Sequence, residues 1–160
     1  MVSRNVRDWL FQSSAFCLYT GLPLPVRRQK CNLEHVVPRR FLRPLRQAQI
    51  DPDNLFVTTV SMNSFRRDFR FASHQEILDS DTDPQLVSTL SGALRHEKRR
   101  LFFPPHGHRT IAHVILTMCD RYPDLPFHSI VSEELLLDWS RRRLSPQEQA
   151  LHTPRQWRMR

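Results

Sequence analysis

The chain has 160 residues, of which 39% are hydrophobic and 25% charged, and this composition suits one globular domain with a modest core. No stretch is apolar for long enough to span a membrane, so a membrane protein is not expected. There are 3 cysteines and no CxxC pair, so a structural zinc site is not expected either.

The net charge is +8, and arginine supplies most of the positive side chains. One interpretation is a basic surface that only keeps the protein in solution. The other is a polyanionic partner, most often nucleic acid. Arginine forms bidentate contacts with phosphate, which favours the second interpretation. The basic side chains form groups at residues 27–30, 39–46, 66–70, 95–100 and 141–143.

The cysteine content indicates the redox conditions of the cellular compartment in which the protein works. Cys17, Cys31 and Cys119 cannot all pair within one chain, so buried or free thiols are expected. The apolar N-terminal stretch is interrupted at residues 12–14, and no good small-residue cleavage site follows it. We therefore expect an intracellular protein, in the cytoplasm or the nucleus, with secretion left open, and we expect a monomer.

The first predicted element is a short helix at residues 4–12, with Val6, Trp9 and Leu10 on one side. We expect it to belong to an N-terminal helical extension that covers residues 1–17.

Two strands and a helix are predicted next. CNLEHVV (31–37) is typical of a strand, and Pro38 ends it. A basic, loop-like segment leads to LFVTTVSM (55–62), whose β-formers predict a second strand. NSFRRDFRF (63–71) then has helical potential.

Three more helices are predicted in the second half of the chain. Asp83 as an N-cap, with Pro84 at the first helical position, predicts a helix that carries a leucine stripe over 86–94. The stretches HRTIAHVILTMCDRY and SEELLLDWSRRR predict the other two, and their apolar stripes indicate core packing. The polar tail at 145–160 is expected to be flexible.

The predicted strands and helix bring a carboxylate, an imidazole and two amide side chains toward one place. Glu34 and His35 end the first strand, Asn54 precedes the second, and Asn63 lies where the second strand gives way to the helix. This set suits hydrolysis of a phosphodiester with one divalent metal ion. Glu34 and Asn63 offer hard oxygen ligands, and His35 suits a general base. Arg66 lies about one helical turn from Asn63 and would hold phosphate oxygens.

Two reservations belong to this constellation. Neighbours on a regular strand point to opposite faces, so Glu34 and His35 share a site only if the backbone bends or the metal lies at the strand's edge. Each residue also has an ordinary explanation: Asn54 is typical of a turn, where its side chain would pin the loop, and Asn63 could be a helix cap.

Three blocks at these positions resemble the endonuclease I family, which belongs to the ββα-metal (His-Me finger) nucleases, relatives of the HNH enzymes. The blocks are NLEHVVP (32–38), DPDNL (51–55) and NSFR (63–66). Weaker likeness extends over about residues 18–149, through LYTG near the start and LLLDW near the end.

The resemblance implies an α+β fold: a ββα-metal core at residues 31–72, inside a mainly helical, nuclease-like single domain over residues 1–160. It implies that Glu34 and Asn63 bind Mg²⁺, or another hard cation such as Mn²⁺ or Ca²⁺, and that His35 is the general base. The substrate would be DNA, and often RNA, cut with little sequence preference.

The basic groups around these residues are expected to grip the nucleic-acid backbone through its phosphates. The candidates are Arg39, Arg40, Arg43, Arg46, Arg67, Arg70, Arg99 and Arg100.

Three positions depart from the family pattern. Phe56 stands where many members carry arginine, Asp53 replaces a histidine, and His113 replaces the arginine of an Ala-Arg pair. These departures leave open a catalytically silent nucleic-acid-binding module on the same fold. A weaker alternative is a protein-interaction domain whose basic face meets an acidic partner.

Overall fold

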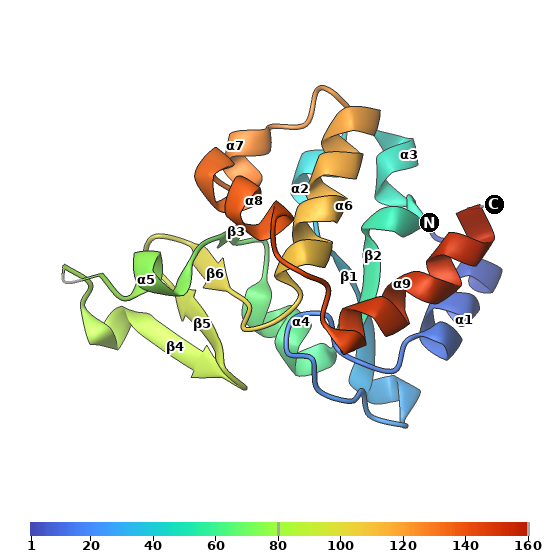
Figure 1. The fold of residues 1–160 in the computed structure, drawn as a ribbon, viewed down its shortest axis with the longest axis horizontal. Coiled ribbons are helices and arrows are strands. Elements are labelled where there is room, and N and C mark those ends of the chain that lie inside the picture. The colour runs from blue at the N-terminus through green and yellow to red at the C-terminus, as the bar shows by residue number, and fades with distance from the viewer. Residues whose placement is uncertain (80, 160) are drawn as a thin grey trace.

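Residues 1–79 and 81–159 are described by the computed structural model, with side chains as far as His152. They form a mixed α+β domain in which helices surround a β-hairpin and a second, small sheet (Figure 1). The α-helices are α1 (Arg4–Ser13), α2 (Arg39–Leu42), α3 (Arg46–Gln49), α4 (Val60–Arg66), α5 (His74–Ile77), α6 (His108–Arg121), α7 (Phe127–Ile130), α8 (Glu133–Ser140) and α9 (Pro146–Met159). The strands are β1 (Cys31–His35), β2 (Leu55–Thr59), β3 (Arg70–Phe71), β4 (Val87–Leu90), β5 (Ala93–His96) and β6 (Leu101–Phe103). Short 3₁₀ turns, η1 (Arg28–Lys30), η2 (Pro52–Asn54) and η3 (Pro84–Leu86), precede β1, β2 and β4.

The strand–strand–helix order predicted within residues 31–72 is confirmed by β1, β2 and α4. The two strands pair antiparallel, with Glu34 opposite Phe56 and His35 opposite Leu55. The segment that joins them was expected to be loop-like, but it contains two single-turn helices, α2 and α3.

Helix α4 begins earlier than predicted and ends earlier as well. The Thr59 hydroxyl caps it by accepting a hydrogen bond from the Met62 N–H at 3.1 Å, which shortens the second strand. The helix ends at Arg66 because Arg67 has a positive φ of 54°, outside the helical region. The hairpin and the short helix therefore form one compact unit.

The predicted helix with a leucine stripe over 86–94 is wrong, because this segment is a β-hairpin of β4 and β5. Ser91 and Gly92 connect the strands with φ of 50° and 84°, and two-residue hairpin turns of type I′ have positive φ at both central positions. The Asp83 side chain does act as a cap, accepting from the Gln85 N–H, but only for a 3₁₀ turn. The Ser-Gly turn signal therefore outweighs the helical spacing.

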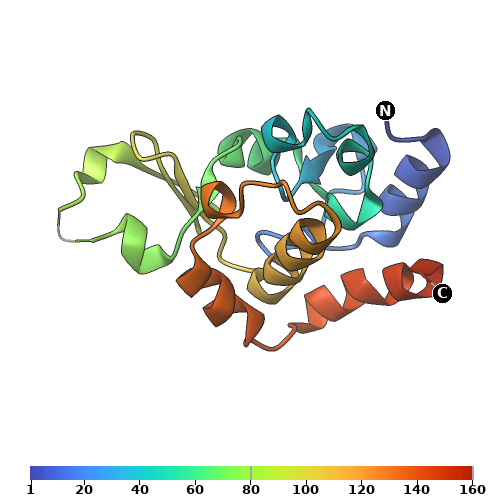
Figure 2. The same ribbon diagram turned by 90° about the horizontal axis from the view of Figure 1, so that it is seen from above.

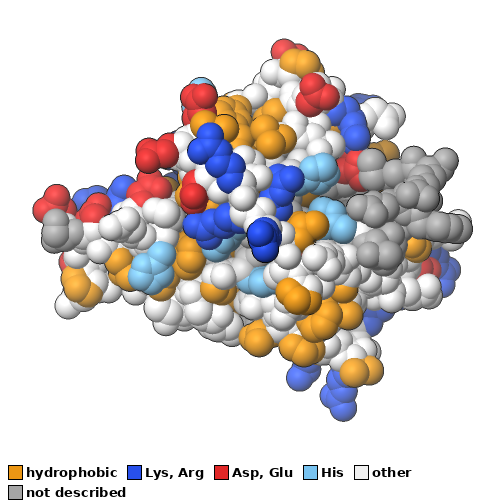
Figure 3. All heavy atoms as spheres, in the orientation of Figure 1, with side chains coloured by type: hydrophobic (Ala, Val, Ile, Leu, Met, Phe, Trp, Pro, Cys, Tyr) orange, Lys and Arg blue, Asp and Glu red, His pale blue; other side chains and the backbone are white. Residues whose placement is uncertain are grey.

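The second sheet has the strand order β3-β6-β5-β4, with β3 and β6 parallel and the other pairs antiparallel. Its strands β4 and β5 extend to the left of the larger helices in Figure 1, with α5 beside them, and acidic side chains gather at the far end of the sheet in Figure 3. Asp79, Asp81 and Asp83 lie in the connection that leads into β4. This end of the molecule is therefore unfavourable for a polyanion.

Helix α1 is packed into the fold and covers one face of the first hairpin. Leu10 on this helix is 1% exposed and lies in a cluster with Leu55 and Val57 of β2. Phe56, on the other face of the same strand, belongs to the main core. The predicted N-terminal helix is confirmed, and its packing fixes it beside β1 and β2.

Helices α6 and α8 are confirmed, and they pack against each other within the main core. Ile111, Ile115 and Met118 of α6 are completely buried. The Ser132 hydroxyl caps α8 by accepting from the Leu135 N–H. Among the described residues, no helix is long and apolar enough to cross a membrane.

The tail was expected to be flexible, but it forms α9, which lies at the same end of the molecule as α1 in Figures 1 and 2. Ser145 and Glu148 form a reciprocal capping box at its start: the Ser145 N–H donates to the Glu148 carboxylate, and the Glu148 N–H donates to the Ser145 hydroxyl. Glu148 is 3% exposed and also accepts hydrogen bonds from the N–H and hydroxyl of Thr110. These bonds fix the start of the tail; its side chains beyond His152 lie outside the described residues.

Candidate active site

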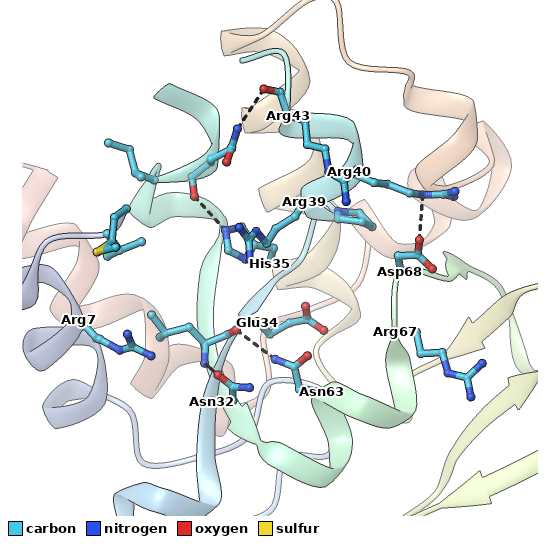
Figure 4. Close-up of a pocket in the computed structure, with 16 residues that line it drawn as sticks. Arg7, Asn32, Glu34, His35, Arg39, Arg40, Arg43, Asn63, Arg67 and Asp68 are labelled. Atoms are coloured by element: carbon cyan, nitrogen blue, oxygen red, sulfur yellow. Dashed lines mark hydrogen bonds and ion pairs between the residues drawn. The ribbon is translucent and has the colours of Figure 1, made fainter. Parts of the chain in front are cut away.

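An open pocket of about 530 Å³ contains the predicted constellation (Figure 4). Residues 32–35 of β1 all line it, together with Asn63 of α4. Within the described residues β1 pairs only with β2, so its other edge is unpaired, and the pocket runs along that edge. Glu34 and His35 therefore reach one pocket although they are neighbours on a strand. The sequence required either a bend in the backbone or a site at the strand's edge, and the pocket lies at the edge.

Glu34 has a buried carboxylate that the protein satisfies only in part. The residue is 4% exposed, and its Oε2 atom has no hydrogen-bond partner among the described residues. The nearest charge is Arg66, whose Nη1 lies 3.4 Å from Oε2. Burial raises the pKa of Glu34 to about 7, although the Arg66 charge opposes this shift. A buried carboxylate that lacks hydrogen bonds at one oxygen, beside a pocket, is suited to a cation.

Asn63 offers a second oxygen next to Glu34, as Figure 4 shows. Its Nδ2 donates a hydrogen bond to the Leu33 carbonyl at 3.1 Å, on the unpaired edge of β1. This bond fixes the orientation of the amide, and Oδ1 accepts no hydrogen bond from the described part of the chain. The side chain is half-buried and lines the pocket, so Oδ1 is a suitable metal ligand.

His35 is held by a single hydrogen bond that determines its tautomer. Its Nε2 lies 2.9 Å from the carbonyl oxygen of Gln49, at the end of α3. A carbonyl only accepts, so Nε2 carries the proton and Nδ1 of the neutral ring keeps its lone pair. Burial lowers the pKa of His35, and the positive charges of Arg39 and Arg66 lower it further, against the opposing effect of the Gln49 carbonyl. The ring is therefore neutral and basic at neutral pH.

Arg66 does not occupy the position predicted for it, and its role as the phosphate-holding residue is contradicted by its burial. Its side chain is 0% exposed. Its guanidinium donates to the carbonyls of His35, Val36 and Phe69, at 3.0, 3.0 and 3.3 Å, and to the Tyr19 hydroxyl at 3.4 Å. The helical spacing placed Arg66 near Asn63 correctly, but it turns into the core and supports the end of β1 from behind.

Asn54 supports the site in the way its predicted role requires. It is completely buried, and its side chain forms two hydrogen bonds with the backbone of Val37. Oδ1 accepts from the Val37 N–H at 2.7 Å, and Nδ2 donates to the Val37 carbonyl at 3.0 Å. The amide thus ties the start of β2 to the chain that follows β1.

The arginines proposed to bind phosphates separate into two groups. Arg39, Arg40, Arg43 and Arg67 line the pocket, whereas the others do not. The side chains outside it are Arg46, Arg70, Arg99 and Arg100. Arg70 donates to the His128 carbonyl, and Arg100 pairs with Asp68. Arg99 pairs with Asp79 and donates to the Glu76 carbonyl.

Three arginines at the pocket have no carboxylate partner among the described residues: Arg7, Arg39 and Arg43. By contrast, Arg40 pairs with Asp68 at 3.2 Å, and Arg67 pairs with Glu97 at 2.6 Å. Exposed ion pairs of this kind contribute little to the stability of the fold, so a phosphate can replace the carboxylate as the partner of the arginine. The pocket therefore carries excess positive charge around the Glu34 oxygen.

Sequence reasoning missed Arg7 and Gln49. Arg7 lies on α1, which was assigned to an extension outside the core, so its place at the pocket depends on long-range packing. Gln49 acts through its backbone carbonyl, which any residue supplies, so no sequence signal marked it.

The positions that depart from the family pattern lie outside the pocket. Phe56 is 2% exposed within the core, and Asp53 pairs with Arg121 at 3.0 Å. His113 lies on the exposed side of α6, with its ring 5.9 Å from that of His152. None of the three lines the pocket, although Phe56 lies opposite Glu34 in the hairpin.

The donor set at the pocket fits a hard, water-rich cation. No three side chains among His, Cys, Asp and Glu gather into a metal site anywhere in the described ranges. One carboxylate oxygen from Glu34 and one amide oxygen from Asn63 leave most of a coordination shell to water. Mg²⁺ keeps several waters and needs few protein ligands, whereas a structural zinc site needs about four nitrogen or sulfur donors.

A comparison with models of known protein families found none that matches the chain, and none of the curated proteins matches it. The function is therefore inferred from the residues and geometry of the pocket.

Proposed function

We propose that the protein is a metal-dependent endonuclease that hydrolyses phosphodiester bonds of DNA, and also of RNA, with little sequence preference. The observation that carries the proposal is that His35 and Glu34 line one basic pocket: His35 Nδ1 has no hydrogen-bond partner among the described residues, and the buried Glu34 Oε2 has an ion pair with Arg66 but no hydrogen bond there. General-base hydrolysis of a phosphodiester needs both of these groups, whereas a surface that only binds nucleic acid needs neither.

Each residue has a specific role in this reaction. The Glu34 carboxylate and Asn63 Oδ1 would hold a divalent cation such as Mg²⁺, which would neutralise negative charge on the phosphate and the leaving oxygen. His35 Nδ1 accepts a proton from the attacking water, and the Gln49 carbonyl stabilises the protonated ring by accepting from Nε2–H. Arg39 and Arg43 hold phosphate oxygens of the bound strand.

The proposal is tested by nicking of supercoiled plasmid with Mg²⁺ or with EDTA, beside the Glu34→Gln protein. We expect nicking with Mg²⁺ alone, and its loss in the variant, because glutamine keeps the shape of the side chain but removes the charge that holds the cation. Nicking that persists in EDTA or in the purified variant would overturn the metal-dependent mechanism. A folded wild-type protein that binds DNA but never nicks it would instead be a catalytically silent binding module.

The pH dependence should report Glu34 more than His35. The Glu34 pKa of about 7 means that, without metal, the carboxyl group is protonated below neutral pH and competes with the cation. Burial lowers the pKa of His35, so its ring gains a proton at lower pH than an ordinary histidine does. We therefore expect kcat/KM to fall as the pH drops below neutrality, and higher Mg²⁺ to move this fall to lower pH. A midpoint that does not move with Mg²⁺ concentration would show that His35 controls the acid side.

A further inference from the structure

The N-terminal helix α1 contributes a positive side chain to the pocket from a different direction than the other arginines. In Figure 4, Arg7 and Arg67 stand on two sides of Glu34 and Asn63, whereas Arg39 and Arg43 stand near His35. Arg7 is exposed, and no carboxylate of the described residues forms an ion pair with it. The neighbouring Arg4 and Arg28 both pair with Asp8, at 3.9 and 2.6 Å.

The position of Arg7 is fixed by packing that does not involve its own side chain. Leu10 anchors α1 against Leu55 and Val57, and Val6 and Trp9 pack on the same cluster. Arg7 flanks this packed side of the helix, one turn before Leu10, and its exposed side chain lines the pocket. A rigid helix that presents an unpaired guanidinium to an anion-binding pocket has the geometry of a preorganised phosphate contact.

We propose that Arg7 binds a backbone phosphate on the side of the metal site away from Arg39 and Arg43, so that the pocket holds a strand with phosphates on both sides of the cleaved bond. This inference rests on the proposed function and narrows it: the preferred substrate is a polynucleotide, and a diester without flanking phosphates gains less from Arg7. α1 then forms one wall of the substrate cleft.

The test compares Arg7→Ala with Arg4→Ala, a matched variant one turn earlier on the same helix that loses the same charge outside the pocket. Binding of a fluorescent DNA duplex is measured in EDTA over a series of salt concentrations. Hydrolysis of bis(4-nitrophenyl) phosphate, a diester without flanking phosphates, is measured with Mg²⁺. Circular dichroism of both variants checks the fold.

We expect Arg7→Ala to bind the duplex about fivefold more weakly at low salt and to reduce the salt slope by about one. Arg4→Ala should bind the duplex and hydrolyse the small diester as the wild type does, whereas Arg7→Ala should lose less of the small-diester hydrolysis than of the duplex binding. Arg7→Lys should recover most of the binding, because it keeps the charge.

Two results would overturn the role of Arg7: duplex binding by Arg7→Ala equal to that of the wild type, or an equal loss of small-diester hydrolysis. The first would mean that no phosphate reaches Arg7, and the second that the substitution disturbs the site itself. A wild-type protein that binds the duplex and cuts nothing would contradict the proposed nuclease function, yet weaker binding by Arg7→Ala would still support the contact.

Discussion

Replacing His35 by alanine should reduce the turnover of plasmid nicking by about 10²- to 10⁴-fold, which is the usual contribution of a positioned general base. The reason is geometric: the Gln49 carbonyl occupies Nε2 at 2.9 Å, so the ring can accept a proton only at Nδ1, and His35 lines the pocket beside Glu34. DNA binding in EDTA should be retained, because His35 is neutral and contributes no charge to phosphate contacts.

The control for this experiment is His128→Ala, since His128 is exposed and does not line the pocket. Added imidazole should restore part of the His35→Ala activity, with greater rescue at pH values where free imidazole is neutral. A merely structural role for His35 would not respond to imidazole. If the purified His35→Ala protein nicked plasmid at the wild-type rate, the assignment of the base would be wrong.

Local sequence was sufficient for the elements that position the site. The β-formers around Glu34 and His35, the polar break at Asn54 and the helical residues around Asn63 reflect short-range preferences, although α4 begins at Val60, before the predicted onset. The hairpin and α4 bring these residues together. The side-chain contacts of Asn54 with Val37 also follow from a loop that must close between two strands.

The predictions that differ from the structure do so for different physical reasons. Leucines spaced four apart suit a helix and also suit a strand, so only the Ser91–Gly92 turn decided between the two. The capping box of Ser145 and Glu148 was present in the sequence, but the further hydrogen bonds from Thr110 to Glu148 join residues that are far apart along the chain. Arg7 reaches the pocket only through tertiary packing, which no local pattern encodes.

Arg66 was misassigned because spacing gives the position of a side chain without its burial. An arginine that binds substrate and an arginine that supports the backbone lie equally well one turn after Asn63. The two roles predict opposite results on substitution. Loss of a phosphate contact would lower activity and leave the fold intact, whereas loss of a core contact would lower the free energy of unfolding.

We expect Arg66→Met to destabilise the protein by about 3–5 kcal/mol, because it leaves the Glu34 carboxylate buried without its counter-charge. It also removes donors from the carbonyls of His35, Val36 and Phe69. The matching decrease in melting temperature is roughly 10 °C or more. Thermal and urea unfolding measure the effect. Arg67→Met, which breaks an exposed pair with Glu97 and removes a guanidinium from the Phe69 ring, should cost less than about 1 kcal/mol.

The double variant Arg66→Met with Glu34→Gln separates the two parts of this penalty. If the unpaired carboxylate causes most of the loss, neutralising it should recover part of the stability, since a buried charge without a partner costs more than a neutral amide. No recovery would assign the loss to the three carbonyls. A single Arg66→Met variant as stable as the wild type but unable to bind DNA would restore the phosphate role that the sequence suggested. The buried geometry of Arg66 predicts the reverse: a less stable protein that, while folded, keeps the DNA binding that we propose for the pocket.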